Sequence, residues 1–227
     1  RLHPMKHLVT GAGSGIGAAI AEALHQRGDE LILIARSAAR ASALGRAFPR
    51  AECLVVDLED PAQIGGLQLP ERLDSVVHAA GVVELARLAD LDQAGLQRQL
   101  AINLTAPTLL TTACLPALRA ASGTVVFINS TAGLTANAGW GAYAASKFGL
   151  RAIADALRAE EQVAGVRVST VFPGRTATAM QEQVHAMEGR DYDPSSWVQP
   201  GTVAERVIDL IDLPRDATVT ELVIRPS

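Results

Sequence analysis

Short apolar runs alternate with helical patterns along most of this chain, and the alternation limits the fold more than any other feature. The apolar runs that predict strands are residues 7–9, 31–35, 53–56, 73–80, 124–128, 166–172 and 219–224. Helical patterns between them end near Gly28 or cover residues 37–48, 91–118 (in two parts separated near 103–107), 141–163 and 203–213. Strands that alternate with helices form a parallel sheet covered on both faces, so we predict an α/β fold with a doubly wound parallel sheet of about seven strands.

Length, charge and hydropathy favour a single domain with a small-molecule partner. The chain has 227 residues, 48% of them hydrophobic, which fits one domain over residues 1–227. A net charge of −4 gives no basic footprint for nucleic acid. No apolar run approaches the ~20 residues that span a bilayer. We therefore expect neither a nucleic-acid nor a membrane partner.

The cysteines and the first residues suggest where the protein works. Cys53 and Cys114 each lie in an apolar segment, so we interpret both as core thiols and expect a reducing, cytoplasmic compartment. Residues 1–4 precede Met5 and lack the apolar region of a signal peptide. We expect them to be a leader or vector-derived residues ahead of a native start at Met5.

A glycine-rich loop connects the first apolar run to the first helical pattern. Its sequence is Thr10-Gly11-Ala12-Gly13-Ser14-Gly15-Ile16-Gly17, of the form T-G-x-x-x-G-x-G. Between a strand and a helix, glycines let the backbone turn tightly and approach a pyrophosphate that rests on the helix N-terminus. We predict a Rossmann-type dinucleotide site at this loop. A glycine turn without a ligand is the alternative interpretation.

The end of the second apolar run indicates which dinucleotide is preferred. In such folds this end faces the adenosine ribose, where a carboxylate reads a 2′-hydroxyl and an arginine accommodates a 2′-phosphate. Here Ala35 is followed by Arg36 and Ser37, and no carboxylate comes before Glu52. Because a guanidinium pairs well with a phosphate, we expect NADP(H) to be preferred, with NAD(H) as the alternative. Arg36 could instead be a solvated cation at a helix start.

Ser130, Tyr143 and Lys147 form the candidate catalytic group. Tyr143 and Lys147 are four residues apart, which on a helix places both side chains on one face. An ammonium beside a phenol lowers the phenol pKa from its usual ~10, so we expect Tyr143 to exchange protons nearer neutral pH. Ser130 follows the buried run 124–128 and can donate a hydrogen bond to a carbonyl oxygen. A tyrosine and a lysine on a solvated helix face are the alternative, because this spacing is common.

The residues singled out so far share a position in the predicted sheet. Glycine or polar residues follow almost every apolar run, at Gly11, Arg36, Asp57, Gly81, Ser130 and Pro173. Ligands of parallel sheets bind beyond the carboxyl ends of the strands. The convergence of these positions predicts a single site at that edge.

With these motifs in this order, residues 6–226 resemble the compact, single-domain members of the short-chain dehydrogenase/reductase family. Residues 10–17 match the family's glycine loop, and His78-Ala79-Ala80-Gly81 matches its N-N-A-G strand end. Ser130 lies thirteen residues before Tyr143, as in the family, and Tyr143 with Lys147 matches Y-x-x-x-K. Further matches are Asp57-Leu58 for the adenine contact, Asn103 for a proton-relay position, and Pro173-Gly174-Arg175-Thr176, with Thr178, beside the nicotinamide carboxamide or the phosphates.

The resemblance implies a hydride-transfer enzyme that interconverts an aldehyde or ketone and its alcohol with NADP(H). Its implied catalytic residues are Ser130, which polarises the carbonyl, Tyr143, the proton donor, Lys147, and Asn103, which orders water. No metal is implied. The predicted cofactor-binding residues are Gly11, Gly13, Ser14, Gly15, Ile16, Gly17, Arg36, Ser37, Asp57, Leu58, Ala79, Ala80, Gly81, Asn103, Tyr143, Lys147, Pro173, Gly174, Thr176 and Thr178.

Two departures from the family pattern affect these expectations. His78-Ala79 replaces the usual paired asparagines, and we interpret His78 as a structural residue at the strand end. The chain ends at Ser227 without the Asp-Gly-Gly tail that helps build one tetramer interface in many relatives. We therefore expect a homodimer as readily as a homotetramer.

Specificity is expected to come from segments near the nicotinamide. The candidates are Val82, Val83, Thr131, Ala136, Asn137 and Trp140, with the stretch 177–199 and its Met180, Met187, Tyr192 and Trp197. We predict that this stretch is a flexible substrate lid; packing of a helical segment is the alternative for Trp197 and Met180. No charged residue in the first group demands an ionic substrate, so we expect a neutral, moderately apolar carbonyl compound.

Two other classes of function share the same fold. A cofactor-binding redox sensor would usually lack the tyrosine or the lysine, and both are present here. An isomerase or lyase would use a bound cofactor without consuming it. A reductase consumes its cofactor, whereas a sensor, an isomerase or a lyase does not.

Overall fold

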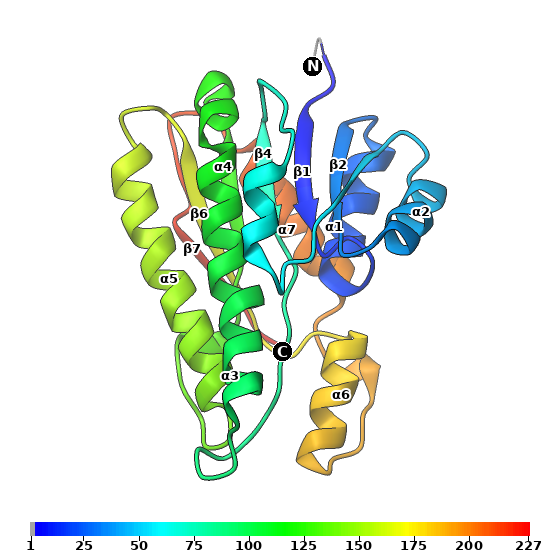
Figure 1. Cartoon of the computed structure of the whole chain (residues 1–227), viewed down its shortest axis with the longest axis vertical. Coiled ribbons are helices and arrows are strands. Elements are labelled where there is room, and N and C mark those ends of the chain that lie inside the picture. The colour runs from blue at the N-terminus through cyan, green and yellow to red at the C-terminus, as the bar shows by residue number, and fades with distance from the viewer. Residues whose placement is uncertain (1–2) are drawn as a thin grey trace.

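The computed structural model describes residues 3–227 and places a parallel sheet between two layers of helices (Figure 1). The strands are β1 (Lys6–Thr10), β2 (Glu30–Ala35), β3 (Glu52–Val55), β4 (Ser75–His78), β5 (Thr124–Ile128), β6 (Arg167–Pro173) and β7 (Glu221–Ile224). They form one seven-stranded sheet in the order β3-β2-β1-β4-β5-β6-β7, and every neighbouring pair is parallel. The predicted doubly wound α/β fold is confirmed. Of the expected leader, residues 1 and 2 lie outside the described part.

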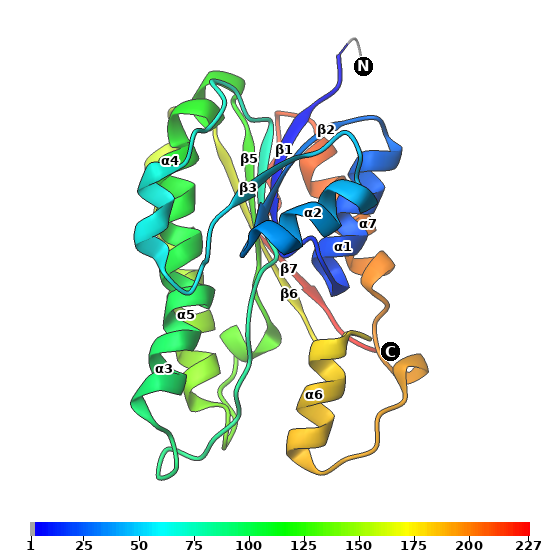
Figure 2. The same cartoon turned by 45° about the vertical axis from the view of Figure 1, so that its right-hand side comes forward.

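Helices cover both faces of the sheet, as Figure 2 shows. On one face lie α1 (Gly15–Gln26), α2 (Ala38–Ala47) and α7 (Pro200–Asp212), and on the other lie α3 (Gln93–Leu100), α4 (Ala106–Ala121) and α5 (Gly141–Glu161). Each layer has its own apolar core, one around Ile20 and Val207 and the other around Leu110 and Leu150. The strands are continuous apolar runs because both of their faces are buried in this way.

The two helical patterns predicted within residues 91–118 form one continuous helix rather than two separate ones. Between α3 and α4 the chain makes a π-helical turn over Ala101–Thr105, closed by a hydrogen bond from the Ala106 amide to the Ala101 carbonyl. Pro107 follows and has no amide hydrogen to donate. A wide turn at this point therefore replaces the expected interruption and buries Asn103.

This continuous helix is an exception to the expectation that no apolar segment is long enough to span a bilayer. Gln93–Ala121 is, by length and composition alone, apolar enough to cross a membrane. Its buried side chains Leu110, Cys114 and Leu118, however, belong to the core under the sheet. We interpret it as the core helix of this domain, since such helices pass the same criterion.

The cysteines differ in their surroundings. Cys114 is buried, and burial raises its thiol pKa to about 12. Cys53, on the edge strand β3, is half-buried and packs against the core, so the prediction of a buried core thiol holds for Cys114 and only in part for Cys53. Neither forms a disulfide. Within residues 3–227, no group of three or more His, Cys, Asp or Glu side chains is arranged to hold a metal ion.

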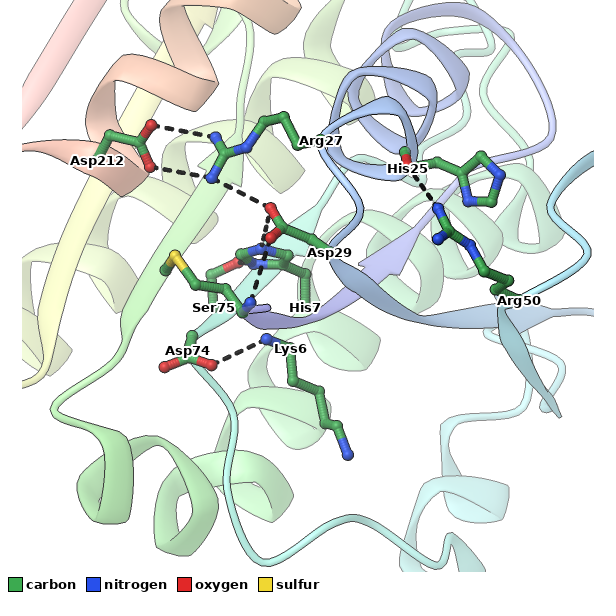
Figure 3. Close-up of polar contacts among 10 residues, drawn as sticks. Lys6, His7, His25, Arg27, Asp29, Arg50, Asp74, Ser75 and Asp212 are labelled. Carbon is green, nitrogen blue, oxygen red and sulfur yellow. Dashed lines mark hydrogen bonds and ion pairs between the residues drawn. The ribbon is translucent and has the colours of Figure 1, made fainter. Parts of the chain in front are cut away.

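A polar network lies at the start of β1, is buried at His7, Asp29 and Ser75, and connects the sheet to the ends of α1 and α7 (Figure 3). The His7 ring lies between Ser75 Oγ at 2.7 Å and Asp29 Oδ2 at 3.2 Å. Arg27 joins Asp29, at 3.1 Å, to Asp212 at the end of α7, also at 3.1 Å. Ser75 and His7 are 0% exposed and Asp29 is 5% exposed, and all three bind one another or nearby groups, so we interpret this serine–histidine–aspartate group as structural.

Candidate active site

A cavity of about 870 Å³ opens at the edge of the sheet where the strands end. Most predicted site residues line it, namely Gly11, Gly13, Ser14, Gly15, Ile16, Arg36, Asp57, Leu58, Ala79, Ala80, Gly81, Ser130, Tyr143, Lys147, Pro173, Gly174, Thr176 and Thr178. Three do not line it: Gly17, Ser37 and Asn103. The fold thus gathers residues from six strand ends around one space, as the convergence of motifs predicts.

The glycine loop is shaped by close backbone approaches. Gly11 has φ +70°, and a Cβ there would lie 2.6 Å from the Ala80 amide nitrogen. A Cβ on Gly17 would lie 2.1 Å from the Gly11 carbonyl oxygen, so only glycine lets the start of α1 pack this closely against the loop. Thr10 Oγ1 accepts hydrogen bonds from the amides of Ala79 and Ala80, both at 3.1 Å. These contacts fix the loop against the end of β4.

The loop leaves an anion-binding surface open toward the cavity. Ser14 is the N-cap of α1, its side chain makes no capping hydrogen bond, and the first turn carries no acidic residue. The helix N-terminus therefore offers amide donors and a positive dipole end to an anion. A Cβ on Gly13 would meet no atom within 4 Å. This cradle fits the pyrophosphate of a nicotinamide dinucleotide.

The end of the cavity beside β2 carries two arginines, one of which sequence reasoning missed. Arg36 follows β2, and Arg40, in the first turn of α2, lines the same cavity. Ser37 instead caps α2, accepting a hydrogen bond from the Arg40 amide at 3.3 Å. The available signal was a second arginine four positions after Arg36, near the start of the helix predicted over residues 37–48. Two guanidinium groups at this end suit a phosphate better than a hydroxyl.

His78 is a structural residue, as interpreted from the sequence. Its Nε2 lies 2.7 Å from Thr111 Oγ1, and its ring stacks on Phe127 at 5.0 Å between centroids. Burial lowers its pKa to about 3, so the imidazole is neutral. This hydrogen bond connects the end of β4 to α4.

Ser130, Tyr143 and Lys147 meet at the other end of the cavity. Ser130 follows β5, and the other two share one face of α5. Tyr143 is 8% and Lys147 3% exposed, so neither lies on a solvated helix face. The Lys147 ammonium donates to the Ile128 carbonyl at 3.1 Å and lies 5.8 Å from the centre of the Tyr143 ring. The alternative of a surface pair is wrong.

The predicted direction of the Tyr143 pKa shift is also wrong for this structure. Burial raises the phenol pKa, and a hydrogen bond with Ser130 offsets part of that rise. Burial also lowers the Lys147 pKa to about 8. A neighbouring ammonium favours the phenolate, but desolvation of the phenolate is the larger effect on the Tyr143 pKa here. Tyr143 is consequently held as a protonated phenol, the form required of a proton donor.

Asn103 has structural contacts that its predicted role did not anticipate. Its Oδ1 accepts from the Val82 amide at 2.9 Å, and its Nδ2 donates to the Val82 carbonyl at 2.8 Å and to Ser146 Oγ at 3.1 Å. The side chain therefore holds the segment after β4 against α5. It lies close to Gly81, which does line the cavity.

The predicted lid contains a regular helix, α6 (Ala179–Glu188). Thr178 caps it by accepting from the Gln181 amide at 3.1 Å, and Gly189 ends it in a left-handed conformation. Both residue types are ordinary cap signals that could have revealed this helix. An isolated parallel β-bridge between Thr176 and Val198 joins the two ends of the stretch.

Only some of the proposed specificity residues face the cavity. Those that line it are Val82, Val83, Thr131, Asn137, Trp140 and Met180, whereas Ala136, Met187, Tyr192 and Trp197 do not. The Trp197 ring packs at 5.2 Å on His185 and beneath the Arg175 guanidinium at 5.7 Å. For Trp197, packing is thus the better interpretation, and Met180 keeps its predicted place.

Comparisons with known proteins agree with this geometry. The family model described as short chain dehydrogenase matches residues 6–189. An uncharacterised short-chain type dehydrogenase/reductase of Sinorhizobium fredii is 30% identical over 100% of this chain and 94% of its own length. An alcohol dehydrogenase from the archaeon Thermococcus sibiricus, complexed with 5-hydroxy-NADP, is 26% identical with a TM-score of 0.85, covering 99% of this chain and 97% of its own. A short-chain dehydrogenase from Sphingobium yanoikuyae in complex with NADPH is 27% identical with a TM-score of 0.81, covering 96% and 87%.

Proposed function

The chain belongs to the short-chain dehydrogenase/reductase family of oxidoreductases, and we propose that it uses NADP(H) to interconvert an aldehyde or ketone and its alcohol. One observation carries the proposal: Ser130, Tyr143 and Lys147 line the same cavity as an anion-binding glycine loop and a pair of arginines. The neutral and apolar lining around Val82, Val83 and Trp140 supports a neutral, moderately apolar substrate.

The residues of the site support a simple division of labour in the reductive direction. When bound, the cofactor supplies the hydride. The Ser130 hydroxyl donates a hydrogen bond to the substrate carbonyl oxygen, and Tyr143 gives that oxygen its proton. Lys147 restores the proton to Tyr143 and holds the ribose of the cofactor, and water ordered near Asn103 reloads Lys147. The glycine loop, with Thr176 and Thr178, holds the phosphates, and Arg36 and Arg40 hold the 2′-phosphate.

Replacing Arg36 by Asp is expected to reverse the cofactor preference. The change removes a charge-assisted pair with the 2′-phosphate and adds repulsion, so the Kd for NADPH should rise about 10- to 100-fold, while that for NADH changes less than about threefold. Titrations followed by nucleotide fluorescence would measure both. Arg46→Asp, in the last turn of α2 and outside the cavity, is the matched control. An unchanged preference in Arg36→Asp would mean that Arg40 or another residue reads the phosphate.

The rate of reduction is expected to fall as the pH rises through about 8. Burial lowers the Lys147 pKa to about 8, so its ammonium is present below that pH and lost above it. The Tyr143 pKa is raised, so the phenol stays protonated over the same range. Measuring kcat between about pH 6 and pH 10 at saturating NADPH would locate the loss. Lys147→Arg, whose guanidinium stays charged, should lack it in whatever activity it retains; an identical decline in that variant would assign it to another group.

The first experiment combines cofactor binding with turnover. NADPH and NADH are titrated into the purified protein, and consumption of each is then followed with a panel of aldehydes and ketones. Tight NADPH binding with turnover supports the reductase, and binding without consumption favours the sensor. A bound cofactor that is unchanged while the substrate is converted favours the isomerase or lyase. Failure to bind either nucleotide would overturn the assignment of the glycine loop.

The remaining expectations are proposals of the same kind. We propose that the protein acts in the cytoplasm. We also propose that it is a homodimer or a homotetramer, and light scattering of the purified protein would distinguish these two states. We also propose that the segment 177–199 closes over bound substrate. Protection of its amides from hydrogen exchange on addition of NADPH and substrate would support the closure.

A further inference from the structure

Asn129 connects the two elements that carry the candidate catalytic group. It is the residue between β5 and Ser130, and it is only 4% exposed. Its Oδ1 accepts a hydrogen bond from the Ser130 amide at 2.8 Å, and its Nδ2 donates one to the Lys147 carbonyl at 2.9 Å. One amide side chain therefore joins the backbone at Ser130 directly to the backbone at Lys147.

This connection matters because Ser130 and Lys147 are on separate elements. Ser130 follows the end of β5, and Tyr143 and Lys147 lie on α5, which meets the sheet through apolar side chains and through the hydrogen bond from the Lys147 ammonium to the Ile128 carbonyl. Apolar packing and a contact at the end of a long lysine side chain tolerate small movements of the two backbones, whereas the two directional hydrogen bonds of Asn129 fix both their distance and their orientation. The hydroxyl of Ser130 and the phenol of Tyr143 must both point at one oxygen atom, so their relative placement needs such a constraint.

The neighbouring Gly133 provides an independent sign that the Asn129 side chain has a reserved place. Gly133 ends the short 3₁₀ turn Thr131–Gly133, and its φ is not in the left-handed region that favours glycine. A Cβ on Gly133 would lie 2.3 Å from Asn129 Oδ1 and 3.1 Å from the Lys147 carbonyl oxygen. Glycine is therefore required here because a Cβ would clash. The Asn129 amide, which binds the Lys147 carbonyl of α5, occupies the space that a Cβ would need.

We propose that Asn129 is a positioning residue that sets Ser130 against Tyr143 and Lys147. The inference rests on the proposed reductase function. Both polar atoms of the Asn129 side chain are engaged with backbone groups. The residue thus acts through Ser130 rather than on the reacting atoms.

A double-mutant cycle with Ser130 tests the proposal. Asn129→Ala should lower kcat for carbonyl reduction by about 10- to 100-fold with little change in KM for NADPH, because misplacement of about 1 Å at a reacting group costs about that much. In a Ser130→Ala background the same change should add less than about twofold, since there is no hydroxyl left to position. A kcat for Asn129→Ala within about twofold of wild type, or a full additional loss in the double mutant, would overturn it.

Gly133→Ala reaches the same contact without removing Asn129. Its methyl group should displace the Asn129 amide and lower kcat about as much as Asn129→Ala does. Added to Asn129→Ala, it should cost little more, because the atom nearest to the new Cβ is gone. Independent, multiplicative losses would contradict a shared mechanism. If Asn129→Ala folds poorly, Gly133→Ala alone tests the proposal, and a kcat within about twofold of wild type in that variant would overturn it.

The matched control is Ser169→Ala. Ser169 is also buried and donates a side-chain hydrogen bond to a backbone carbonyl, that of Val219 at 2.7 Å, but it does not line the cavity. The Ser169→Ala variant should be less stable than wild type but keep its kcat. A fall in kcat that is confined to the Asn129 and Gly133 variants would then reflect lost positioning and not lost stability. Absence of NADPH-dependent turnover in wild type would defeat the proposed function and the positioning role with it. Turnover that depends on Ser130 but not on Asn129 would defeat the positioning role alone.

Discussion

Replacing Tyr143 by Phe is expected to lower kcat for carbonyl reduction by about 10³-fold while leaving NADPH affinity within about threefold. A positioned general acid contributes roughly 10²- to 10⁴-fold, and the change removes only the oxygen that carries the proton. The ring is buried and packs edge-to-face on Trp140 at 5.8 Å, and phenylalanine keeps that contact. Because Tyr143 is held protonated by burial, its loss removes the proton source rather than a charge.

The measurement is kcat and KM for the best carbonyl substrate at saturating NADPH, with NADPH affinity from a separate titration. Tyr192→Phe is the matched control, since Tyr192 is the only other tyrosine in the chain and does not line the cavity. Its hydroxyl donates to the Thr178 carbonyl at 3.4 Å, so its removal should have little effect on kcat. A Tyr143→Phe enzyme that kept more than a tenth of its kcat with every substrate would place the proton donor elsewhere.

Most of the fold could be predicted from the sequence because parallel strands buried on both faces leave a strong pattern. Each predicted strand overlaps an observed one, and no boundary differs by more than two residues. The positions of the site followed from the same pattern, since Gly11 and Ser130 come within two residues after a strand and Pro173 is the last residue of one. In a parallel sheet the order of strands does not alter the fact that all their carboxyl ends share one edge.

The features that sequence reasoning missed depend on contacts between distant segments. Arg40 joins Arg36 at the cavity only because α2 begins where it does. The pKa of Tyr143 depends on burial, which spacing along a helix cannot give. The roles of Asn129 and Gly133 depend on their closeness to the Lys147 carbonyl, and no local sequence pattern predicts that contact. Residue types thus locate the chemistry, whereas tertiary packing decides its electrostatics and its precision.

Replacing Gly17 by Ala is expected to destabilise the protein by about 3 kcal/mol and to raise the Kd for NADPH more than about 100-fold. A Cβ at this position would lie 2.1 Å from the Gly11 carbonyl oxygen and 2.6 Å from the Gly11 carbonyl carbon. Both atoms belong to the backbone, so the loop or the start of α1 must move, which overpacking data place at roughly 1–3 kcal/mol or more. Chemical denaturation and nucleotide titration would measure the two effects.

Gly13→Ala separates the role of the cofactor from that of the fold. Here a Cβ meets nothing within 4 Å in the protein, so the unfolding free energy should stay within about 0.5 kcal/mol of wild type. The new methyl group would nevertheless point into the space assigned to the pyrophosphate, and NADPH binding should weaken at least about tenfold. Gly201→Ala, exposed in α7 and equally free of neighbours, controls for the change in backbone entropy. If Gly13→Ala bound NADPH as tightly as wild type, the pyrophosphate would have to lie elsewhere, and the close approach of Gly17 to Gly11 would be a packing feature alone.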